Sequence, residues 1–525
     1  MGIYVNPDHA SFKKAVESQI YIDKSGLIPI LNGLLGTEQC YVCVSRARRF
    51  GKSVTAGMIK AYYSKGCDSR ELFHGLEIEK DKSYETYLNQ YDVIHVDMAE
   101  MWSNVGKNEE RFLSTFNKTI LEELQKEYSM VDISECSTIA MALSQISHVC
   151  KAQFVVIIDE WDTVFREAKQ NKKLQDEYIS LLRALFKGES SKRFIALAYM
   201  TGILPIKKYG IESALNNFDE YTMISPKMLA KYYGFTSDEV QRLCEQYGME
   251  FDKMCEWYDG YSFKNAEHIY NPNSVVKAIR FETYESYWSH TEAFSSLSGY
   301  ISLNFEGLRD DIIRMFAGER CRVKVGSFEN DFVSYKSKDD VMTALIHLGY
   351  LAYDLESKEA YIPNKEVQEA FEYAIEGAKW SEVVNAMDAS ERLLRSTWQK
   401  DVDAVADAME KVHAEAASVL QYNDENSLSC AITLAYYHAR EYYQIMREAP
   451  FGKGYADLVF VPKKNKDVPA MIIELKCDKT PEEAIAQIKE RNYMDGMKEY
   501  RGNMLLVGIS YDRKTKKHSC AITEW

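Results

Sequence analysis

Short apolar runs alternate with helical patterns over the first 225 residues of the chain. The runs are nearly continuous in Val, Ile and aromatic residues, as strands buried on both faces are. They cover Gln39–Ser45, Asp92–Met98, Phe154–Ile158, Phe194–Thr201 and, more weakly, Tyr221–Ile224. Helical patterns such as Lys52–Tyr63 and Leu174–Phe186 separate them. This alternation predicts an α/β fold over residues 1–225, with a mostly parallel sheet and helices on both of its faces.

From about residue 226 to residue 420 the pattern becomes helical, with scattered aromatic residues and few apolar runs of strand length. Turn chemistry recurs there, at Asp259-Gly260 and at Asn271-Pro272. Most of the aromatic side chains are expected to pack in the core or against helices. These residues are therefore predicted to form a mainly helical middle or lid region.

The last hundred residues, about 421–525, carry a third pattern in the order α-β-β-β-α-β. A helix is predicted over Glu425 to Tyr437, and a second begins after Thr480, which supplies an N-cap ahead of a proline and two acids. The predicted strands are Tyr442–Arg447, Tyr455–Val461, Ala470–Lys476 and Met504–Ser510. Because 525 residues exceed what one hydrophobic core usually supports, two or three domains are expected. The three patterns divide the chain into domains at 1–225, 226–420 and 421–525.

Composition narrows the class of protein. No window approaches eighteen uninterrupted apolar residues, and the N-terminus lacks the basic start and apolar run of a secretory signal, so no membrane span is expected. The 11 cysteines, an odd number, indicate reduced thiols and a cytoplasmic protein. Cys40 and Cys43 form a C-x-x-C, but they lie in an apolar run without a second suitable pair, which favours a buried strand over metal or redox chemistry.

Charge is unevenly distributed along the chain. The net charge of −15 argues against a protein coated in nucleic acid. Residues 40–75 and, more mildly, residues 452–525 are nevertheless basic. This distribution permits the binding of polyphosphate or nucleic acid at two places, and establishes neither.

A phosphate-binding loop is predicted between the strand Tyr41–Ser45 and the helix that follows. Gly51 would let the backbone approach phosphates closely, Lys52 would reach the β- and γ-phosphates, and the Ser53 hydroxyl would ligate magnesium. Arg46 replaces the first glycine of the G-x-x-x-x-G-K-[ST] pattern, so the match is partial. The predicted ATP-binding residues are Arg49, Phe50, Gly51, Lys52, Ser53 and Val54.

Two adjacent acids strengthen this prediction. The run Phe154–Ile158 ends in Asp159 and Glu160, of which the first would hold magnesium and the second would polarise the attacking water. Thr201 ends the next apolar run and is placed to sense the γ-phosphate, although an ordinary strand end is an equal interpretation. The expectation is a site for ATP and Mg²⁺ that also hydrolyses ATP. The alternative is a scaffold whose loop has decayed at Arg46.

Several motifs in succession resemble a known family. They are Tyr21–Ser25, Arg48–Ser53, Ile157–Asp162, Thr201–Leu204, Ser213–Asn217 and Trp257–Tyr261. Together they resemble the bacterial AAA-ATPase-like proteins that often end in a PD-(D/E)XK nuclease-superfamily domain. The chain departs from that family at Ala47, where Pro is usual, and at Trp161, where Tyr is common. The resemblance implies a P-loop ATPase domain followed by a C-terminal restriction-endonuclease-like domain, whose core matches the α-β-β-β-α-β order.

A second set of charged residues lies near the C-terminus. Strand periodicity puts Glu474 and Lys476 on one face, and a hairpin partner can bring Asp457 beside them. The two acids would hold Mg²⁺, and the lysine would orient water or steady developing charge in phosphodiester cleavage. Gln487 on the next helix would brace this site, and Glu425 on the preceding helix would add a carboxylate. The alternative is a cross-face salt bridge, which the surrounding apolar run Ala470–Ile473 disfavours.

Two functions are consistent with these residues. In the first, the nucleotide state of the N-terminal site controls cleavage of DNA or RNA by the C-terminal site. In the second, the C-terminal domain is a nucleotide-switched binding module that grips a partner or nucleic acid without cutting it. AAA-type ATPases often take an arginine from a neighbouring subunit, so a homo-oligomer is expected by analogy, although the sequence identifies no such arginine.

Overall fold

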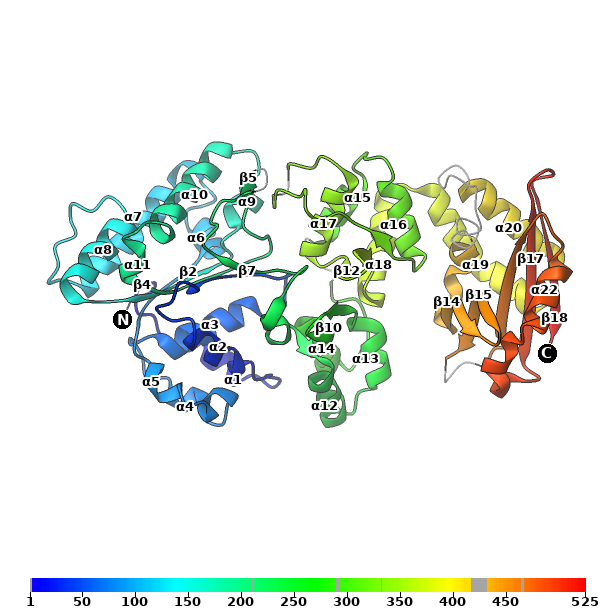
Figure 1. Cartoon of the computed structure of the whole chain (residues 1–525), viewed down its shortest axis with the longest axis horizontal. Helices are drawn as coiled ribbons and strands as arrows, with labels where there is room; N and C mark the ends of the chain where they lie inside the picture. The colour runs from blue at the N-terminus through cyan, green and yellow to red at the C-terminus, as the bar shows by residue number, and fades with distance from the viewer. Residues whose placement is uncertain (1, 210–211, 289–292, 332, 417–431, 464–466) are drawn as a thin grey trace. The chain divides into compact units, whose positions relative to one another are not determined.

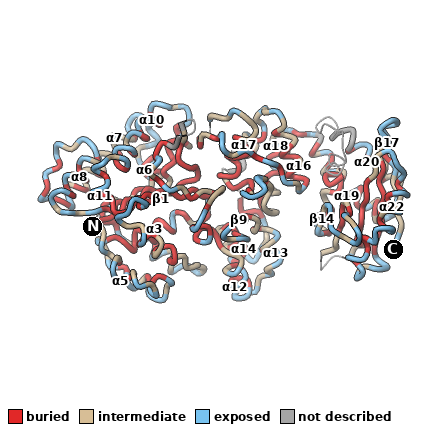
Figure 2. Tube along the Cα trace, in the orientation of Figure 1, coloured by how far each residue is buried: buried red, intermediate tan, exposed pale blue. Residues whose placement is uncertain are grey.

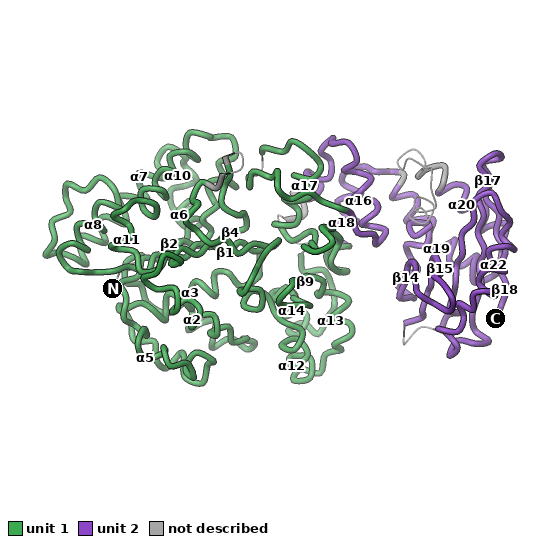
Figure 3. The backbone as a smooth tube through the Cα atoms, in the orientation of Figure 1, with its two compact units in different colours: residues 1–290, 322–368 green, residues 291–321, 369–525 purple. Residues whose placement is uncertain are grey.

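The chain is described by a computed structural model over residues 2–209, 212–288, 293–331, 333–416, 432–463 and 467–525 (Figure 1). It divides into two compact units (Figure 3). Unit 1 holds residues 1–290 and 322–368, and unit 2 holds residues 291–321 and 369–525. The division into three domains was drawn from the sequence and stays a prediction, whereas the structure divides into two units.

Unit 1 is built on a five-stranded parallel sheet, as predicted. Its strand order is β2-β3-β4-β1-β7. The strands are β1 (Tyr41–Ser45), β2 (Asp92–Asp97), β3 (Phe154–Asp159), β4 (Ile195–Gly202) and β7 (Asp219–Tyr221). Every residue of β1, β3 and β4 is buried (Figure 2), which explains their continuous apolar sequences.

The predicted fifth strand was placed too late in the chain. It was expected at Tyr221–Ile224, but β7 spans Asp219–Tyr221. The residues that follow form a turn, in which the Thr222 N–H donates to the Ser225 carbonyl oxygen at 3.1 Å and the Thr222 hydroxyl accepts from the backbone of Ile224. A Thr hydroxyl that bonds nearby backbone competes with strand pairing, so the ladder ends at Tyr221.

Helices cover both faces of this sheet. Figure 1 shows α1 to α5 on one side and α6 to α10 on the other. Their bounds are α1 (Ala10–Val16), α2 (Ile28–Asn32), α3 (Lys52–Tyr63), α4 (Arg70–Phe73), α5 (Tyr84–Tyr87), α6 (Met98–Asn104), α7 (Glu109–Glu127), α8 (Ile139–Cys150), α9 (Thr163–Glu167), α10 (Lys172–Phe186) and α11 (Ser191–Phe194). Side chains cap the N-termini of α6, α7, α8 and α10, whereas within the described residues no side chain caps α3.

The rest of unit 1 is mainly helical, as predicted, with short strands between its helices. Its elements are η3 (Lys227–Tyr232), β8 (Phe235–Thr236), α12 (Ser237–Tyr247), α13 (Phe251–Tyr258), β9 (Tyr261–Phe263), β10 (Ala266–Tyr270), α14 (Pro272–Phe281), α17 (Lys338–Leu348), β12 (Ala352–Asp354) and β13 (Glu359–Tyr361). A half-buried ion pair joins this region to the N-terminal motif Tyr21–Ser25, since Lys24 Nζ donates to Glu239 Oε2 at 2.7 Å.

Unit 2 carries the second sheet, with strand order β14-β15-β16-β17-β18. Its elements are α15 (Ala293–Ile301), α16 (Leu308–Phe316), α18 (Lys365–Gly377, which begins in unit 1), α19 (Ser381–Trp398), α20 (Val402–Ala416), η4 (Tyr437–Glu441), β14 (Tyr443–Phe451), β15 (Gly454–Pro462), β16 (Ala470–Cys477), α22 (Pro481–Glu490), η5 (Tyr493–Tyr500), β17 (Met504–Asp512) and β18 (Lys517–Glu524). Among the described strands of this sheet only β16 and β17 pair in parallel, because α22 crosses between them.

This sheet confirms the predicted mixed C-terminal fold and adds one strand to it. The sequence prediction ended at Ser510, but β18 returns antiparallel to β17 after a turn at Asp512–Lys516. The predicted helix Glu425–Tyr437 lies for the most part outside the described residues. Within the described chain, no helix combines the length and the apolar character that crossing a membrane requires.

Gly202 ends β4 against two buried side chains, Trp161 and Asp162. A Cβ atom there would lie 2.7 Å from the Trp161 ring and 2.8 Å from Asp162 Oδ1. Trp161 is fully buried, and its indole N–H donates to the Leu204 carbonyl oxygen at 3.3 Å, so the ring cannot withdraw without losing that bond. The glycine is therefore required for close packing at this edge of the sheet.

We expect Gly202→Ala to destabilise unit 1 by about 1–3 kcal/mol, because overpacking forces rings and backbone to move. Thermal unfolding followed by circular dichroism would show a lowered midpoint. Gly33→Ala is the matched control, since its Cβ would meet nothing closer than 3.4 Å at an exposed helix end. Equal midpoints for the two variants would contradict the packing argument.

Candidate functional site

The loop between β1 and α3 has the backbone that its glycine predicted. Gly51 has φ 86° and Arg49 has φ 70°, so the chain makes two left-handed steps before the helix begins. Lys52 is 4% exposed, and its Nζ donates to the carbonyl oxygens of Arg46 and Ala47, each at 3.0 Å. The lysine side chain thus folds back onto the start of the loop, beside the uncapped N-terminus of α3. Such an N-terminus favours an anion.

Arg46, the residue in place of a glycine, is turned into the core. It is fully buried, and its Nη1 donates to the carbonyl oxygens of Ser45 at 2.9 Å and Tyr221 at 2.8 Å. Its guanidinium lies 5.2 Å from the centre of the Tyr233 ring. Burial lowers the pKa of Arg46 to about 10. The side chain therefore ties β1 to β7.

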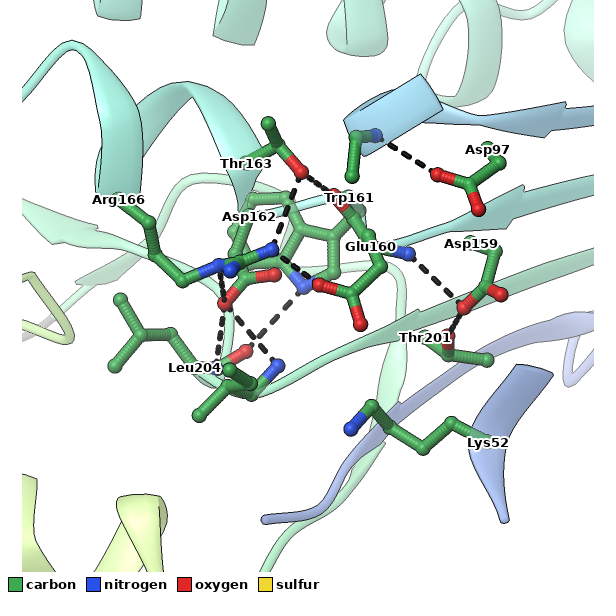
Figure 4. A network of polar contacts seen from close by, with 12 residues as sticks. Lys52, Asp97, Asp159, Glu160, Trp161, Asp162, Thr163, Arg166, Thr201 and Leu204 are labelled. Carbon is green, nitrogen blue, oxygen red and sulfur yellow. Dashed lines mark hydrogen bonds and ion pairs between the residues drawn. The ribbon is translucent and has the colours of Figure 1, made fainter. Parts of the chain in front are cut away.

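Three hydroxyl and carboxyl groups converge at the ends of β3, β4 and α3. Asp159 is 2% exposed and accepts a hydrogen bond from Thr201 Oγ1 (Figure 4). Burial raises the pKa of Asp159, while hydrogen bonds from Thr201 and Ser53 lower it, and burial is the larger effect. Ser53, Asp159 and Thr201, predicted separately, are therefore brought together, although the Thr201 hydroxyl points at the aspartate.

Glu160 is held by a residue that the sequence reasoning missed. It has φ 53°, an uncommon conformation for a residue other than glycine, and its Oε2 accepts from Arg166 Nη2. Arg166 also pairs with Asp162, whose Oδ2 lies 3.3 Å from Arg166 Nε (Figure 4). The i,i+4 spacing of Asp162 and Arg166 was the one signal in the sequence for this pair.

A further acid, Asp97, was also missed. It ends β2 directly beside Asp159 in the sheet register, and burial raises its pKa to about 6. Its side chain caps α6 by accepting from the N–H groups of Ala99 and Glu100. The signal was available, because the predicted run Asp92–Met98 contains an aspartate at its carboxyl end.

Arg49 and Phe50 fasten the loop to the helical part of unit 1. Arg49 Nη1 donates to the Tyr287 carbonyl oxygen at 3.0 Å, and the Phe50 ring meets Tyr261 edge-on at 5.2 Å. Their side chains are therefore held by protein contacts, so any contact of these two residues with a ligand is expected from their backbone. Val54 is 48% exposed on the first turn of α3.

Gly349 supports the loop from behind. It has φ 85° and approaches Ala47 so closely that a Cβ would lie 2.6 Å from the Ala47 side chain. The loop is thus positioned by the remainder of unit 1 and not by its own residues alone. A loop held in this way is suited to bind anions through its backbone N–H groups.

Glu366 is a buried acid that bonds to Tyr287, the residue whose carbonyl oxygen accepts from Arg49. It is 1% exposed, and its Oε1 accepts from Ser274 Oγ at 2.9 Å and from the Tyr287 N–H at 2.8 Å. Burial raises its pKa to about 7, although the nearby Arg49 acts in the opposite direction. Glu366 thus fixes the segment to which the loop arginine bonds.

The predicted C-terminal site lies on β15, β16 and α22. Glu474 is 1% exposed, and its Oε1 accepts from Lys476 Nζ at 3.0 Å and from Gln487 Nε2. Asp457 Oδ2 accepts from the Leu475 N–H at 2.7 Å. Burial, followed by the charge of Asp457, raises the pKa of Glu474 to about 7. All four predicted residues therefore gather on one side of the sheet, and Glu425 lies outside the described residues.

This group has the donors of a small cation site. Among the described residues, Glu474 Oε2 is buried without a hydrogen-bond partner, which a divalent cation would satisfy. Only two carboxylates contribute, and the described chain holds no cluster of three or more His, Cys, Asp or Glu side chains arranged for a metal. The residues fit a metal that completes its coordination with water or substrate oxygens.

The cysteine pair has no such character. Cys40 and Cys43 are both buried beside or within β1. Burial raises the pKa of Cys40 to about 11 and that of Cys43 well above its ordinary value. Both thiols therefore stay protonated, as expected for cysteines of a buried strand.

Comparison with known families agrees with this division of sites. Residues 9–212 match the family described as "Predicted AAA-ATPase", and residues 424–520 match the PD-(D/E)XK nuclease superfamily. The resemblance drawn from the motifs is thereby confirmed. The chain carries an AAA-ATPase-like domain and, at its C-terminal end, a domain of the PD-(D/E)XK nuclease superfamily.

Individual relatives are distant. An uncharacterized protein in the vnfD 5' region of Azotobacter chroococcum mcd 1 is 23% identical over 280 residues, which are 52% of this chain and 50% of that protein. The match thus spans about half the length of this curated relative. Among solved structures, Aeropyrum pernix ORC2 in ADPNP–ADP complexes is 12% identical with a TM-score of 0.31, covering 71% of this chain and 98% of its own. AMPPCP-bound DnaA from Aquifex aeolicus is 12% identical with a TM-score of 0.26, covering 63% and 89%. Similarity this low supports no conclusion about this chain.

We expect the stability of unit 1 to fall as pH rises from about 4.5 to 7, because folded Glu366 keeps a proton that the unfolded chain releases. The pKa difference corresponds to roughly 3 kcal/mol over that window. Glu366→Gln removes the ionisation and should flatten this dependence, measured as unfolding midpoints between pH 5 and pH 8. Glu122→Gln, on an exposed helix face, is the control. The change of the unfolding midpoint with pH is compared between variants, so a loss of stability that is equal at every pH does not affect the result. An unchanged pH dependence in Glu366→Gln would contradict the raised pKa of Glu366.

Proposed function

We propose that the chain binds ATP with Mg²⁺ at the loop Arg46–Ser53, hydrolyses it, and uses its nucleotide state to control metal-dependent cleavage of nucleic acid by the C-terminal domain. The observation that carries this proposal is the convergence of Ser53, Asp159 and Thr201 beside Lys52. A buried carboxylate that meets a serine hydroxyl at an uncapped helix N-terminus is suited to a phosphate-bound cation.

Each residue of the N-terminal site has a task in this proposal. Backbone N–H groups of the loop and the Lys52 ammonium would bind the phosphates, and Ser53 with Asp159 would hold the magnesium ion. Magnesium neutralises phosphate charge when it is bound. Glu160 would orient the attacking water. The burial of Arg46 in the core supports a functional loop over a decayed one.

The C-terminal site would likewise act on a phosphate group, that of a phosphodiester, with a bound metal ion and a lysine. Asp457 and Glu474 would hold the metal, which lowers the pKa of a bound water. Lys476 would steady charge on the scissile phosphate, and Gln487 fixes the Glu474 carboxylate. Glu425, which lies outside the described residues, is proposed to add a further carboxylate. The nuclease-superfamily match and the orphaned oxygen of Glu474 support this assignment.

A catalytically silent binding module is the second candidate. It is favoured by the small ligand set among the described residues, two carboxylates of which one already accepts from Lys476. A metal held this weakly could be lost without loss of the fold, since Lys476 and Gln487 satisfy part of Glu474. In that case the domain would grip nucleic acid without cutting it.

We expect Lys52→Ala to weaken ATP binding about 10- to 100-fold, the effect of losing charge-assisted hydrogen bonds to phosphate. Binding of a fluorescent ATP analogue by the full chain, with Mg²⁺ present, measures it. Lys118→Ala is the control, because that lysine is exposed on α7 and forms an ion pair with Glu122. Wild-type affinity in the Lys52 variant would favour the interpretation of the loop as a decayed scaffold.

We expect Glu474→Ala and Lys476→Ala each to reduce nucleic acid cleavage at least about 100-fold, since removal of one charge-stabilising group costs that much in comparable sites. The full chain would be incubated with Mg²⁺ or Mn²⁺ and single- and double-stranded DNA and RNA, with and without ATP. Glu490→Ala, exposed on α22, is the matched control. ATP should change the wild-type rate and leave Lys52→Ala unaffected. Nucleotide-dependent association without any cleavage would select the binding module.

A further inference from the structure

Glu160 is connected to the end of β4 by a chain of charged groups (Figure 4). Its Oε2 accepts from Arg166 Nη2, and Arg166 Nε forms an ion pair with Asp162 Oδ2 at 3.3 Å. The side chain of Arg166 is 10% exposed and that of Asp162 is fully buried. Ion pairs this well shielded hold their geometry far better than exposed ones.

Asp162 is in turn fixed by backbone. Its Oδ2 accepts from the N–H groups of Ile203 at 3.1 Å and Leu204 at 2.9 Å, directly after β4. Thr201, the partner of Asp159, is only two residues before Ile203. The segment that holds Asp162, and through it Arg166, is therefore the same segment that carries Thr201. The end of β4 thus holds the Asp159 carboxylate directly and the Glu160 carboxylate through Asp162 and Arg166.

The backbone of Glu160 makes this support necessary. With φ 53°, the residue occupies the left-handed region, which is strained for a residue with a side chain. Its N–H donates to Asp159 Oδ1 at 3.0 Å, which helps to hold that turn. The Glu160 side chain accepts from Arg166. Burial lowers the pKa of Lys52, and among the carboxylates that act in the opposite direction the charge of Glu160 is the strongest.

Arg166 is charged and suited to bridge two carboxylates. Burial lowers its pKa, but Asp162 and Glu160 outweigh burial, so the pKa lies above its ordinary value. Its Nη2 also donates to Thr163 Oγ1 at 3.2 Å. A planar guanidinium presents donors in a rigid fork, whereas a lysine ammonium is a point charge on a flexible stem. Only the fork reaches Asp162 and Glu160 together.

We propose that Arg166 is a positioning residue for ATP hydrolysis: it holds Glu160 in register with the phosphate-binding loop and does not itself bind the nucleotide. This inference rests on the proposed hydrolysis of ATP at the N-terminal site. Glu160 would activate water only from a narrow range of positions, because small displacements of a catalytic group cost large factors in rate. The bridge through Asp162 supplies that restriction from within one chain.

The test uses the full chain and separates binding from turnover. Steady-state phosphate release gives kcat and KM, and a fluorescent ATP analogue gives Kd, for wild type, Arg166→Ala and Arg166→Lys. We expect Arg166→Ala to lower kcat about 10- to 100-fold while KM and Kd change by less than about twofold. Arg166→Lys should recover part of kcat, and added guanidinium ion should partly rescue Arg166→Ala but not Lys52→Ala.

Arg70→Ala is the matched control, because Arg70 forms an exposed ion pair with Glu85 on the surface of unit 1. An unchanged or raised kcat in Arg166→Ala overturns the assignment, as does a fall in kcat that follows a loss of nucleotide affinity. If Arg166→Ala fails to fold, Arg166→Lys decides by the same comparison of kcat with Kd. A wild type that binds ATP but shows no Lys52-dependent turnover overturns the proposed hydrolysis itself, and with it this inference.

Discussion

Asp159 is a carboxylate buried at the end of a central strand, and a charge in that place needs partners drawn from other elements. Thr201 and Ser53 supply them, one from β4 and one from α3. The parallel arrangement of β3, β4 and β1 makes this possible, because the carboxyl ends of parallel strands share one edge of the sheet. The first turn of α3, the end of β4 and the turn at Glu160 are each tied to this one buried group.

The same requirement operates in the C-terminal domain. Glu474 is as deeply buried as Asp159, and among the described residues Lys476 and Gln487 satisfy only one of its oxygens. Burial of an incompletely paired acid costs stability, and such groups concentrate at functional sites. The two domains thus present the same physical signature, a buried carboxylate with partners from neighbouring elements, on two different sheets.

The sequence alone determined the parallel sheet, the loop with its lysine, and the acids that end β3. Burial on both faces leaves continuous apolar runs, and a phosphate-binding loop needs a fixed local spacing. The sequence also grouped Asp457 with Glu474 and Lys476, since strand alternation and a hairpin suffice to place them on one side of a sheet. All of these features depend on neighbours in sequence or on regular strand pairing.

Only the tertiary structure decided the partners of those groups. That Arg46 is buried, that Glu366 stands behind Arg49, and that Arg166 bridges two acids depends on which side chains meet across elements far apart in the chain. The fifth strand of the first sheet was misplaced because the hydroxyl of a turn residue, Thr222, ends it. The strand β18 was missed because it forms by pairing at the edge of its sheet. Long-range contacts of single side chains leave no period in the sequence, so the chemistry of the site could be predicted while its support could not.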